Sequence, residues 1–313
     1  MSPRVSALAL AALIIISAAL TQVDAVHTTP RATSPTARDI AVPPYFVFQA
    51  NSLASAAANS TQGPSRDWNV LDPQVGAASA LVYSLDDDAI LLGARTYARW
   101  PMASLTKLLS AIVTAEDLGY HKRIVMTDSA IATEGNGIAF NPNEEFSARD
   151  LARIMVMTSS NDAAAALEEH VGGRDAFLTL MRATTEKIGM AQTILTDAAG
   201  LSRANESSAS DMVKLLKYLA TARPEILEWT RAPRFLFQPT NDPTSRTAVN
   251  INPFADDPRF LGGKTGTLPE ARENFAGIFT LAGRRVAVVV LGSADRIREV
   301  NQLLDWVIKA YTW

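Results

Sequence analysis

The chain has 313 residues, of which 48% are hydrophobic and 19% are charged, and its formal net charge is −3. This length is sufficient for one large domain or two small ones with a sizeable core. The weakly acidic balance argues against nucleic acid as a partner, because no basic excess is available to neutralise a phosphate backbone. Cysteine is absent, which excludes disulfides, thiolate metal sites and a cysteine nucleophile.

Histidine is sparse in this sequence. The three histidines are His27, His121 and His170, and none of them belongs to an HExxH zinc motif. A G-x-S-x-G segment is also absent, so a Ser-His-Asp hydrolase with a nucleophile elbow has little support. The sequence therefore predicts an activity that needs no metal and no cofactor.

The N-terminus has the pattern of an export signal. Arg4 precedes an apolar run over residues 7–20, and Ala25 ends a plausible cleavage site. The run is shorter than the roughly 20 apolar residues of a bilayer span, which favours a cleaved signal over residues 1–25, with an uncleaved anchor as the alternative. Residues 26–67, rich in Ser, Thr, Pro and Ala, are predicted to form a disordered tether. The bulk of the chain is then expected outside the cytoplasm, in the periplasm or cell-wall space, with no membrane contact beyond this N-terminal segment.

The predicted folded domain, residues 68–313, begins with two strands. Residues 77–83 and 89–92 are mostly apolar and β-forming, and the acidic triplet at 86–88 favours a turn between them.

The middle of the chain is predicted to be helical. A first helix is expected over residues 101–118, with Gly119 as its stop signal. A capping-box-like start predicts a second helix over residues 147–158. Two further helices are expected over about 175–188 and 210–221.

The final third returns to strands. Residues 274–281 and 285–291 are apolar runs on either side of the turn residues 282–284, so they predict an antiparallel hairpin. A closing helix is expected over 296–311. Strands at both ends and helices between them predict an α/β fold of the α+β type, in which an antiparallel sheet flanked by helices carries an inserted all-helical lobe. A cleft between sheet and lobe is the expected place for a site.

The stretch WPMASLTKLL places Ser104 and Lys107 three residues apart at the start of the first helix. Positions i and i+3 share a helix face, so the amine reaches the hydroxyl, and the positive end of the helix dipole favours negative charge developing on Ser104. A lysine acts as a base only when burial or a neighbouring cation lowers its pKa. A second lysine is therefore expected nearby.

A second motif, Ser159-Ser160-Asn161, ends the helix over 147–158. Taken alone, such residues more often cap a neighbouring helix than take part in chemistry.

A third motif, K-T-G, precedes the C-terminal hairpin and is rarer by chance than the other two. Its functional interpretation is a strand edge that faces the cleft. Lys264 would supply a positive charge, Thr265 and Thr267 would supply hydroxyls, and Gly266 would give the substrate room to approach.

Together, S-x-x-K, S-x-N and K-T-G in this order resemble the serine D-alanyl-D-alanine carboxypeptidases and endopeptidases among the low-molecular-mass penicillin-binding proteins. The resemblance covers about residues 68–313 and includes LTDAAGLSRANESSASDM and LGGKTGT. It implies a β-lactamase/DD-peptidase-like fold, peptidoglycan stem peptides as substrate and β-lactams as covalent inhibitors.

By this resemblance, Ser104 is the nucleophile that attacks the carbonyl between the last two D-alanines and forms an acyl-enzyme. Lys107 is similar to the family's general base, and Ser159 would carry a proton toward the leaving amine. The backbone N–H groups of Ser104 and Thr267 would form the oxyanion hole, and water would release the acyl group.

The resemblance also implies substrate-binding residues. Asn161 would orient Lys107 and hold the substrate backbone. Lys264 would help to keep Lys107 neutral and would attract the substrate carboxylate, alongside Thr265 and Gly266. Arg296, at the start of the closing helix, would help to bind that terminal carboxylate.

The sequence departs from the family's pattern in two ways. Many members continue into a β-rich domain and a membrane anchor, whereas this chain stops after the closing helix, so any tethering is expected from the N-terminus. Thr267 stands where many members carry an aromatic residue or histidine. Carboxypeptidase activity is the first prediction, and this difference keeps D,D-endopeptidase activity as the alternative.

Two other interpretations receive less support. A class A β-lactamase needs a glutamate that activates the deacylating water, and Glu168 and Glu169 follow Asn161 too closely for that role. A non-catalytic wall-binding module is disfavoured because all three motifs are intact.

Overall fold

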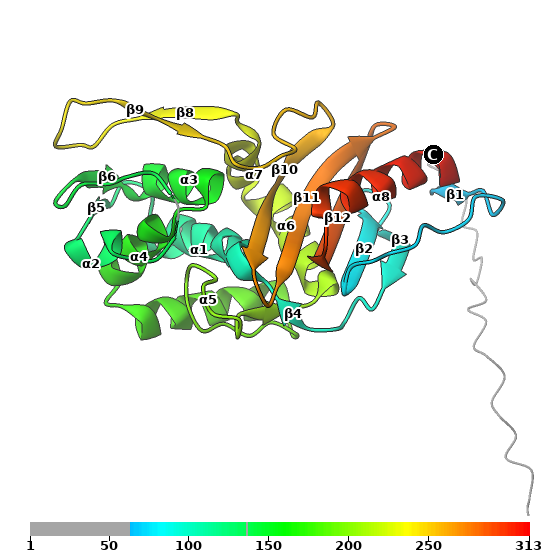
Figure 1. Ribbon diagram of the computed structural model, residues 1–313, viewed down its shortest axis with the longest axis horizontal. Helices are drawn as coiled ribbons and strands as arrows, with labels where there is room; N and C mark the ends of the chain where they lie inside the picture. The colour runs from blue at the N-terminus through cyan, green and yellow to red at the C-terminus, as the bar shows by residue number, and fades with distance from the viewer. Residues whose placement is uncertain (1–62, 136) are drawn as a thin grey trace, which may run out of the picture. The chain divides into compact units, whose positions relative to one another are not determined.

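The computed structural model describes residues 63–135 and 137–313. The predicted signal over 1–25 and all but the end of the predicted tether lie outside these residues. Within the described part of the chain, no helix has both the length and the apolar character that a membrane span requires. The fold is α+β, as predicted, with an antiparallel sheet and a group of helices beside it (Figure 1).

The main sheet has five antiparallel strands drawn from both ends of the domain. Their order across the sheet is β10 (Phe260–Leu268), β11 (Arg272–Leu281), β12 (Arg284–Ser293), β2 (Ser79–Ser84) and β3 (Ala89–Ala94). The chain therefore leaves the sheet after β3, builds the helical region, and returns through β10 at the opposite edge. Both predicted hairpins are present.

Strand β12 shows how the sheet separates two hydrophobic cores. Side chains alternate between the faces of a strand, and here both faces are covered, so the valine-rich strand is buried along most of its length. Val286, Val288 and Val290 face a core under α8 (Arg296–Ala310), whereas the alternate residues Ala287, Val289 and Leu291 face the core of the helical region. Figure 1 shows α8 lying on one side of the sheet and α6 (Ala209–Ala222) on the other.

The core under α8 is built around four phenylalanines. Phe254 lies 4.9 Å from Phe275 and 5.5 Å from Phe279 between ring centroids, and Phe260 lies 5.3 Å from Phe279. All four are buried. Such edge-to-face and tilted pairs add to the stabilisation from buried area, so this cluster fixes the sheet that carries the K-T-G strand.

The helical region surrounds α1 (Lys107–Val113), all of whose residues are buried. The helices α3 (Ala148–Thr158), α5 (Arg174–Ile188) and α7 (Pro224–Arg231) pack against it. The helix α4 (Asn161–His170) packs on α3 and α5, and α2 (Asp128–Ile131) packs on α4. Short two-stranded ribbons complete the fold: β4 (Trp100–Pro101) with β7 (Glu206–Ser207), β5 (Arg123–Val125) with β6 (Glu145–Ser147), and β8 (Arg234–Phe237) with β9 (Arg246–Val249).

The first predicted helix, over residues 101–118, differs from the observed structure. Pro101 belongs to strand β4, and the helical segment begins with a 3-10 turn over Ala103–Thr106 before α1. It ends in a π-helical turn over Thr114–Leu118, with Gly119 as the predicted stop at φ 84°. The strand pairing of Pro101 holds the backbone extended, which delays the helix by two residues. The other predicted strands and helices agree with the structure to within two residues at each end.

Ordered structure starts before Trp68. Strand β1 (Ser65–Arg66) pairs with β13 (Tyr311–Thr312), inside the range predicted as tether. The Arg66 guanidinium lies 4.7 Å from the Trp68 ring centroid and 4.9 Å from that of Trp306, and it forms an ion pair with Asp72 at 2.7 Å. These contacts attach residues 65–66 to the end of α8.

Candidate active site

Ser104 and Lys107 meet because the chain makes a 3-10 turn at this point. In a 3-10 helix, residues i and i+3 eclipse each other, and the Lys107 Nζ lies 3.1 Å from the Ser104 Oγ. Ala103, immediately before the serine, has a φ of 50°. A positive φ is uncommon for alanine, and such strained residues cluster at functional sites.

The Lys107 amine lies in a fully buried position. Its Nζ lies 2.7 Å from the Asn161 Oδ1 and also bonds to the Ala199 carbonyl. Burial lowers the pKa of Lys107 to about 7, although the negative charge of Asp197 partly opposes this shift. About half of the amine is therefore neutral near pH 7, as a proton acceptor must be.

In the second motif, one residue caps a helix and the other two contact the buried lysines. Ser160 is the N-cap of α4 and accepts the backbone N–H of Ala163. Ser159 has left-handed backbone geometry with φ 60°, and its Oγ lies 3.1 Å from the Lys264 Nζ. Asn161 bonds to Lys107 and thereby links the motif to the nucleophile.

Lys264, on β10, is the second lysine that the sequence required. It is buried, and its Nζ also donates to the Thr265 carbonyl at 2.9 Å. Burial lowers the pKa of Lys264 well below its usual value, and the positive charges of Lys107 and Arg296 lower it further. Lys264 was expected to help keep Lys107 neutral, and burial is the main cause of the lowered pKa at both lysines.

Gly266 is required by packing against the nucleophile turn. A Cβ at this position would lie 2.6 Å from the Met102 carbonyl oxygen and 3.2 Å from the Ser104 backbone nitrogen. The prediction gave this glycine the role of making room for substrate. The structure gives a different reason, which is that only a residue without a side chain lets β10 lie directly against the turn that carries Ser104.

The far end of the K-T-G strand meets the closing helix. Arg296, the first residue of α8, donates from Nη1 to the Gly266 carbonyl and to the Thr267 Oγ1, both at 2.8 Å. Thr267 is exposed, whereas Thr265 is buried. All the residues selected from the sequence therefore lie in one region, which is formed by the 3-10 turn and the start of α1, the start of α4 with the residues just before it, β10 and the start of α8.

Sequence reasoning missed the segment that closes the site behind Lys107. The carboxylate of Asp197 accepts four backbone N–H groups, at positions 199 to 202, and so presents the Ala199 carbonyl to Lys107. Gly200 has φ 80°, and a Cβ there would lie 2.0 Å from the Ala103 carbonyl oxygen. The stretch Asp-Ala-Ala-Gly is a turn signal, but nothing in it indicates a lysine partner.

Asn274 on β11 is a second residue without a sequence signal. Its side chain donates to the carbonyls of Pro101 and Met102 at 2.8 and 3.1 Å and accepts the Gly292 N–H at 2.8 Å. This buried amide ties the sheet to the strained turn before Ser104.

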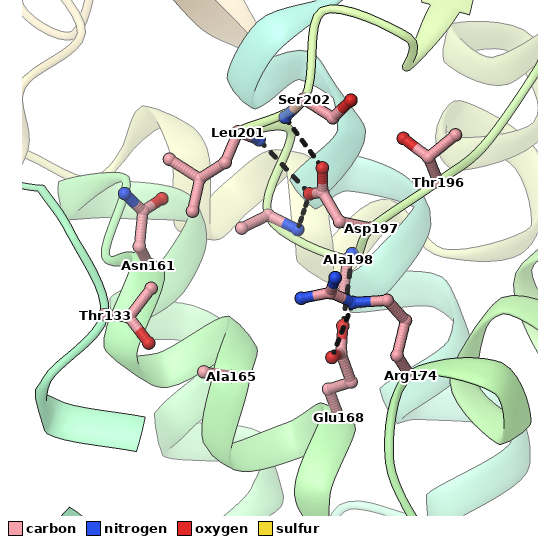
Figure 2. Close-up of a pocket in the computed structure, with 11 residues that line it drawn as sticks. Thr133, Asn161, Ala165, Glu168, Arg174, Thr196, Asp197, Ala198, Leu201 and Ser202 are labelled. Carbon is pink, nitrogen blue, oxygen red and sulfur yellow. Dashed lines mark hydrogen bonds and ion pairs between the residues drawn. The ribbon is translucent and has the colours of Figure 1, made fainter. Parts of the chain in front are cut away.

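A cavity of about 430 Å³ lies beside the catalytic residues (Figure 2). Its walls come from α4, the start of α5, Thr133 and the 196–202 loop. Asn161 and Ala199, the two partners of Lys107, both line it.

The fold and the site are those of a serine hydrolase in which the candidate nucleophile, Ser104, contacts a buried lysine. The chain belongs to the D-alanyl-D-alanine carboxypeptidase family of serine peptidases, whose sequence profile matches residues 66–295. This family is the one that the three motifs resembled.

Individual relatives agree with this assignment. A D-alanyl-D-alanine carboxypeptidase of Mycobacterium tuberculosis is 29% identical over 78% of this chain and 82% of its own length. A D-alanyl-D-alanine endopeptidase of Escherichia coli is 27% identical over 86% of this chain and 85% of its own. The crystal structure of a D-alanyl-D-alanine carboxypeptidase from M. tuberculosis superposes with a TM-score of 0.69 at 26% identity, over 77% of this chain and 95% of that one.

Proposed function

We propose that this protein is a D-alanyl-D-alanine carboxypeptidase that cleaves the terminal bond of peptidoglycan stem peptides through an acyl-serine intermediate. The observation that carries the proposal is the contact between the Ser104 hydroxyl and the buried amine of Lys107, whose pKa is about 7. Family membership supports the same chemistry.

In the acylation step, the Ser104 hydroxyl gives its proton to the neutral Lys107 amine while its oxygen bonds to the carbonyl carbon of the penultimate D-alanine. The backbone N–H groups of Ser104 and Thr267 stabilise the oxyanion, and loss of one such donor typically costs about 10²–10³ in rate. The C–N bond then breaks. Ser159 delivers its hydroxyl proton to the departing amine, which leaves as D-alanine, and takes up the proton held by the Lys107 ammonium, so that Lys107 is neutral again.

The deacylation step reverses the proton path. A water molecule gives a proton to the neutral Lys107 amine while its oxygen attacks the ester carbonyl, and the Ser104 oxygen then leaves and takes that proton back from Lys107. A class A β-lactamase would use a glutamate to activate this water. Neither Glu168 nor Glu169 offers a free carboxylate for that role, because Glu168 pairs with Arg174 at 3.3 Å and Glu169 accepts a hydrogen bond from Thr127.

The terminal carboxylate of the substrate would bind beside the K-T-G strand. Arg296 supplies positive charge there, Lys264 supplies an amine whose charged form the carboxylate would favour, and Thr265 and Thr267 supply hydroxyls. A carboxylate held by charge-assisted hydrogen bonds selects for a free chain end.

D,D-endopeptidase activity is the second candidate. Thr267 is small and exposed, and an open groove of about 620 Å³ runs from it along Leu268, Pro269 and Glu273. Space next to the carboxylate site would accommodate a leaving group larger than D-alanine. The similarity to an endopeptidase supports this candidate.

The activity places the protein outside the cytoplasm, because peptidoglycan lies there. We propose that residues 1–25 are an export signal and that the segment from 26 to β1 tethers the domain. N-terminal sequencing of the protein from its native envelope fraction would detect cleavage after Ala25, whereas a retained N-terminus would identify an anchor.

The intact mass of the protein after addition of benzylpenicillin tests the proposed function. The acyl-serine mechanism predicts a long-lived adduct that is lost in Ser104→Ala and kept in Ser245→Ala, a control in an exposed loop. Release of D-alanine from a pentapeptide and cleavage of a cross-linked dimer then separate the two candidate activities. Rapid turnover of the adduct would identify a β-lactamase, and absence of any adduct on folded protein would contradict the proposal.

A further inference from the structure

The cavity in Figure 2 adjoins the reaction centre through two of its walls. Asn161 lines it and bonds to the Lys107 Nζ at 2.7 Å, and that nitrogen lies 3.1 Å from the Ser104 Oγ. Ala199 also lines the cavity and bonds to Lys107. A substrate attached to Ser104 therefore has this cavity within reach.

One face of α4 forms the floor of the cavity. Asn161, Ala165 and Glu168 are spaced at i, i+4 and i+7, which places them on one side of the helix. At a rise of 1.5 Å per residue, the floor runs about 10 Å from the catalytic asparagine to Glu168. Ala165 is the small residue between them and leaves the middle of the floor open.

The far end of the cavity carries one negative and one positive side chain. Glu168 is largely buried, with 14% of its side chain exposed, whereas 64% of the Arg174 side chain is exposed. The Arg174 Nε contacts the Glu168 Oε1 at 3.3 Å, and its two Nη groups have no hydrogen-bond partner among the described residues. The carboxylate can accept from an ammonium, and the free guanidinium edge can donate to a carboxylate in a bidentate pair.

We propose that this cavity is the subsite for the third residue of the stem peptide and that it selects a side chain ending in a free amino acid group, with both an ammonium and a carboxylate. Glu168 would bind the ammonium, and the Nη groups of Arg174 would bind the carboxylate. A side chain with an ammonium alone, as in lysine, would leave Arg174 without its partner. This inference rests on the proposed peptidase function.

The dimensions agree with this assignment. The third residue is one position before the D-alanine that acylates Ser104, and one extended residue spans about 3.5 Å. A side chain of four to five bonds of about 1.5 Å adds about 6 Å in extended form. The sum is close to the length of the floor between Asn161 and Glu168.

The test compares two synthetic pentapeptides, L-Ala-γ-D-Glu-X-D-Ala-D-Ala, in which X is meso-diaminopimelic acid or L-lysine. The full-length protein is expected to release D-alanine from the diaminopimelic acid peptide with a kcat/KM about ten- to hundredfold higher, the range for one additional charge-assisted hydrogen-bonded pair. The readout is the ratio of the two kcat/KM values. A loss of folded enzyme lowers both values equally and therefore leaves the ratio unchanged.

Substitutions identify the source of the selectivity. Arg174→Ala is expected to bring the ratio of the two kcat/KM values close to one. Glu168→Gln keeps an oxygen acceptor for the Ala198 N–H, and it is expected to lower kcat/KM for both peptides because both carry the ammonium. The matched control is Arg123→Ala. Arg123 is similarly exposed, at 72%, and pairs with Glu145 at 3.2 Å, but it does not line the cavity, and its substitution should leave the ratio unchanged.

The outcomes separate this inference from the function on which it rests. If the protein forms no penicillin adduct and releases no D-alanine, the peptidase function itself fails. If it is active but the ratio is near one, or if Arg174→Ala keeps the wild-type ratio, the subsite assignment is overturned while the peptidase function stands. A preference for the lysine peptide would likewise overturn the selection of a free amino acid group.

Discussion

The buried amine of Lys107 predicts a specific pH dependence of acylation. A lysine with the ordinary pKa of 10.5 would be neutral in about 3 molecules in 10⁴ at pH 7, whereas burial lowers the pKa to about 7 and makes about half of the molecules neutral. Burial thus raises the concentration of the competent base about a thousandfold at neutral pH. Below pH 7 the neutral form falls tenfold per pH unit.

The measurement is the second-order rate of acylation by benzylpenicillin between pH 5 and pH 9, which reports the free enzyme. The rate is expected to rise with pH to a plateau with a midpoint near 7, and the rate at pH 5 should be about a hundredfold below the plateau. Circular dichroism at each pH would show that the protein stays folded.

Asp197→Asn provides a directional check on the same reasoning. The Asp197 carboxylate raises the pKa of Lys107, against the larger effect of burial. Removal of its charge is therefore expected to move the midpoint to lower pH. A flat profile from pH 5 to pH 9, or a midpoint that moves upward in this variant, would refute the assignment of Lys107 as the base.

Three further substitutions test the site and its support. Gly266→Ala places a Cβ 2.6 Å from the Met102 carbonyl oxygen and should slow penicillin acylation at least tenfold while costing about 1–3 kcal/mol of unfolding free energy; an unchanged rate would contradict the close packing of β10 on the turn. Arg296→Ala should raise KM for a pentapeptide about tenfold or more, since a charge-assisted hydrogen bond is worth about 1.5–3 kcal/mol, and steady-state kinetics with an unchanged KM would remove Arg296 from the carboxylate site. Phe279→Ala empties part of the phenylalanine cluster and should cost about 3–5 kcal/mol in a urea titration, with penicillin acylation of the folded fraction as the check that the site is spared.

The sequence predicted the architecture well because periodicity and turn residues are local signals. The hairpin of β11 and β12 was predicted from two apolar runs around Ala282-Gly283-Arg284, and α3 from its Ser147 cap, which does accept the Asp150 N–H. The helix at Pro101 was placed too early because its start is set by a tertiary contact. Pro101 pairs with Glu206, more than a hundred residues away, and no local pattern reports that pairing.

The sequence predicted which residues form the site, whereas the hydrogen bonds that link most of them could be identified only in the structure. The spacing of Ser104 and Lys107 indicated their contact, because i and i+3 meet in either helix type. The bond from Lys107 to the Ala199 carbonyl joins positions 92 residues apart, and its acceptor is a backbone group without any side-chain signature. Asn274 was not predicted for a related reason, because a single asparagine in a strand has many possible hydrogen-bond partners.

The two buried lysines suggest how the terminal carboxylate of a substrate takes part in its own cleavage. Burial lowers the pKa of both Lys107 and Lys264 in the free enzyme, and the positive charge of Lys107 lowers the pKa of Lys264 further. A carboxylate beside Lys264 favours the charged form of that lysine and so raises its pKa, and the restored charge then disfavours a proton on Lys107. Bound substrate would thus keep the base neutral at a lower pH than in the free enzyme.

This reasoning predicts a difference between two substrates that differ at one group. The kcat for a peptide ending in D-alanine should have its acid limb at lower pH than the kcat for the same peptide ending in D-alaninamide, because kcat reports the enzyme–substrate complex. The amide cannot restore the charge on Lys264, so its acid limb should stay near pH 7, the value set by burial of Lys107. Coincident limbs would show that the carboxylate contributes to binding alone and that the protonation of Lys107 is fixed by the fold before substrate arrives.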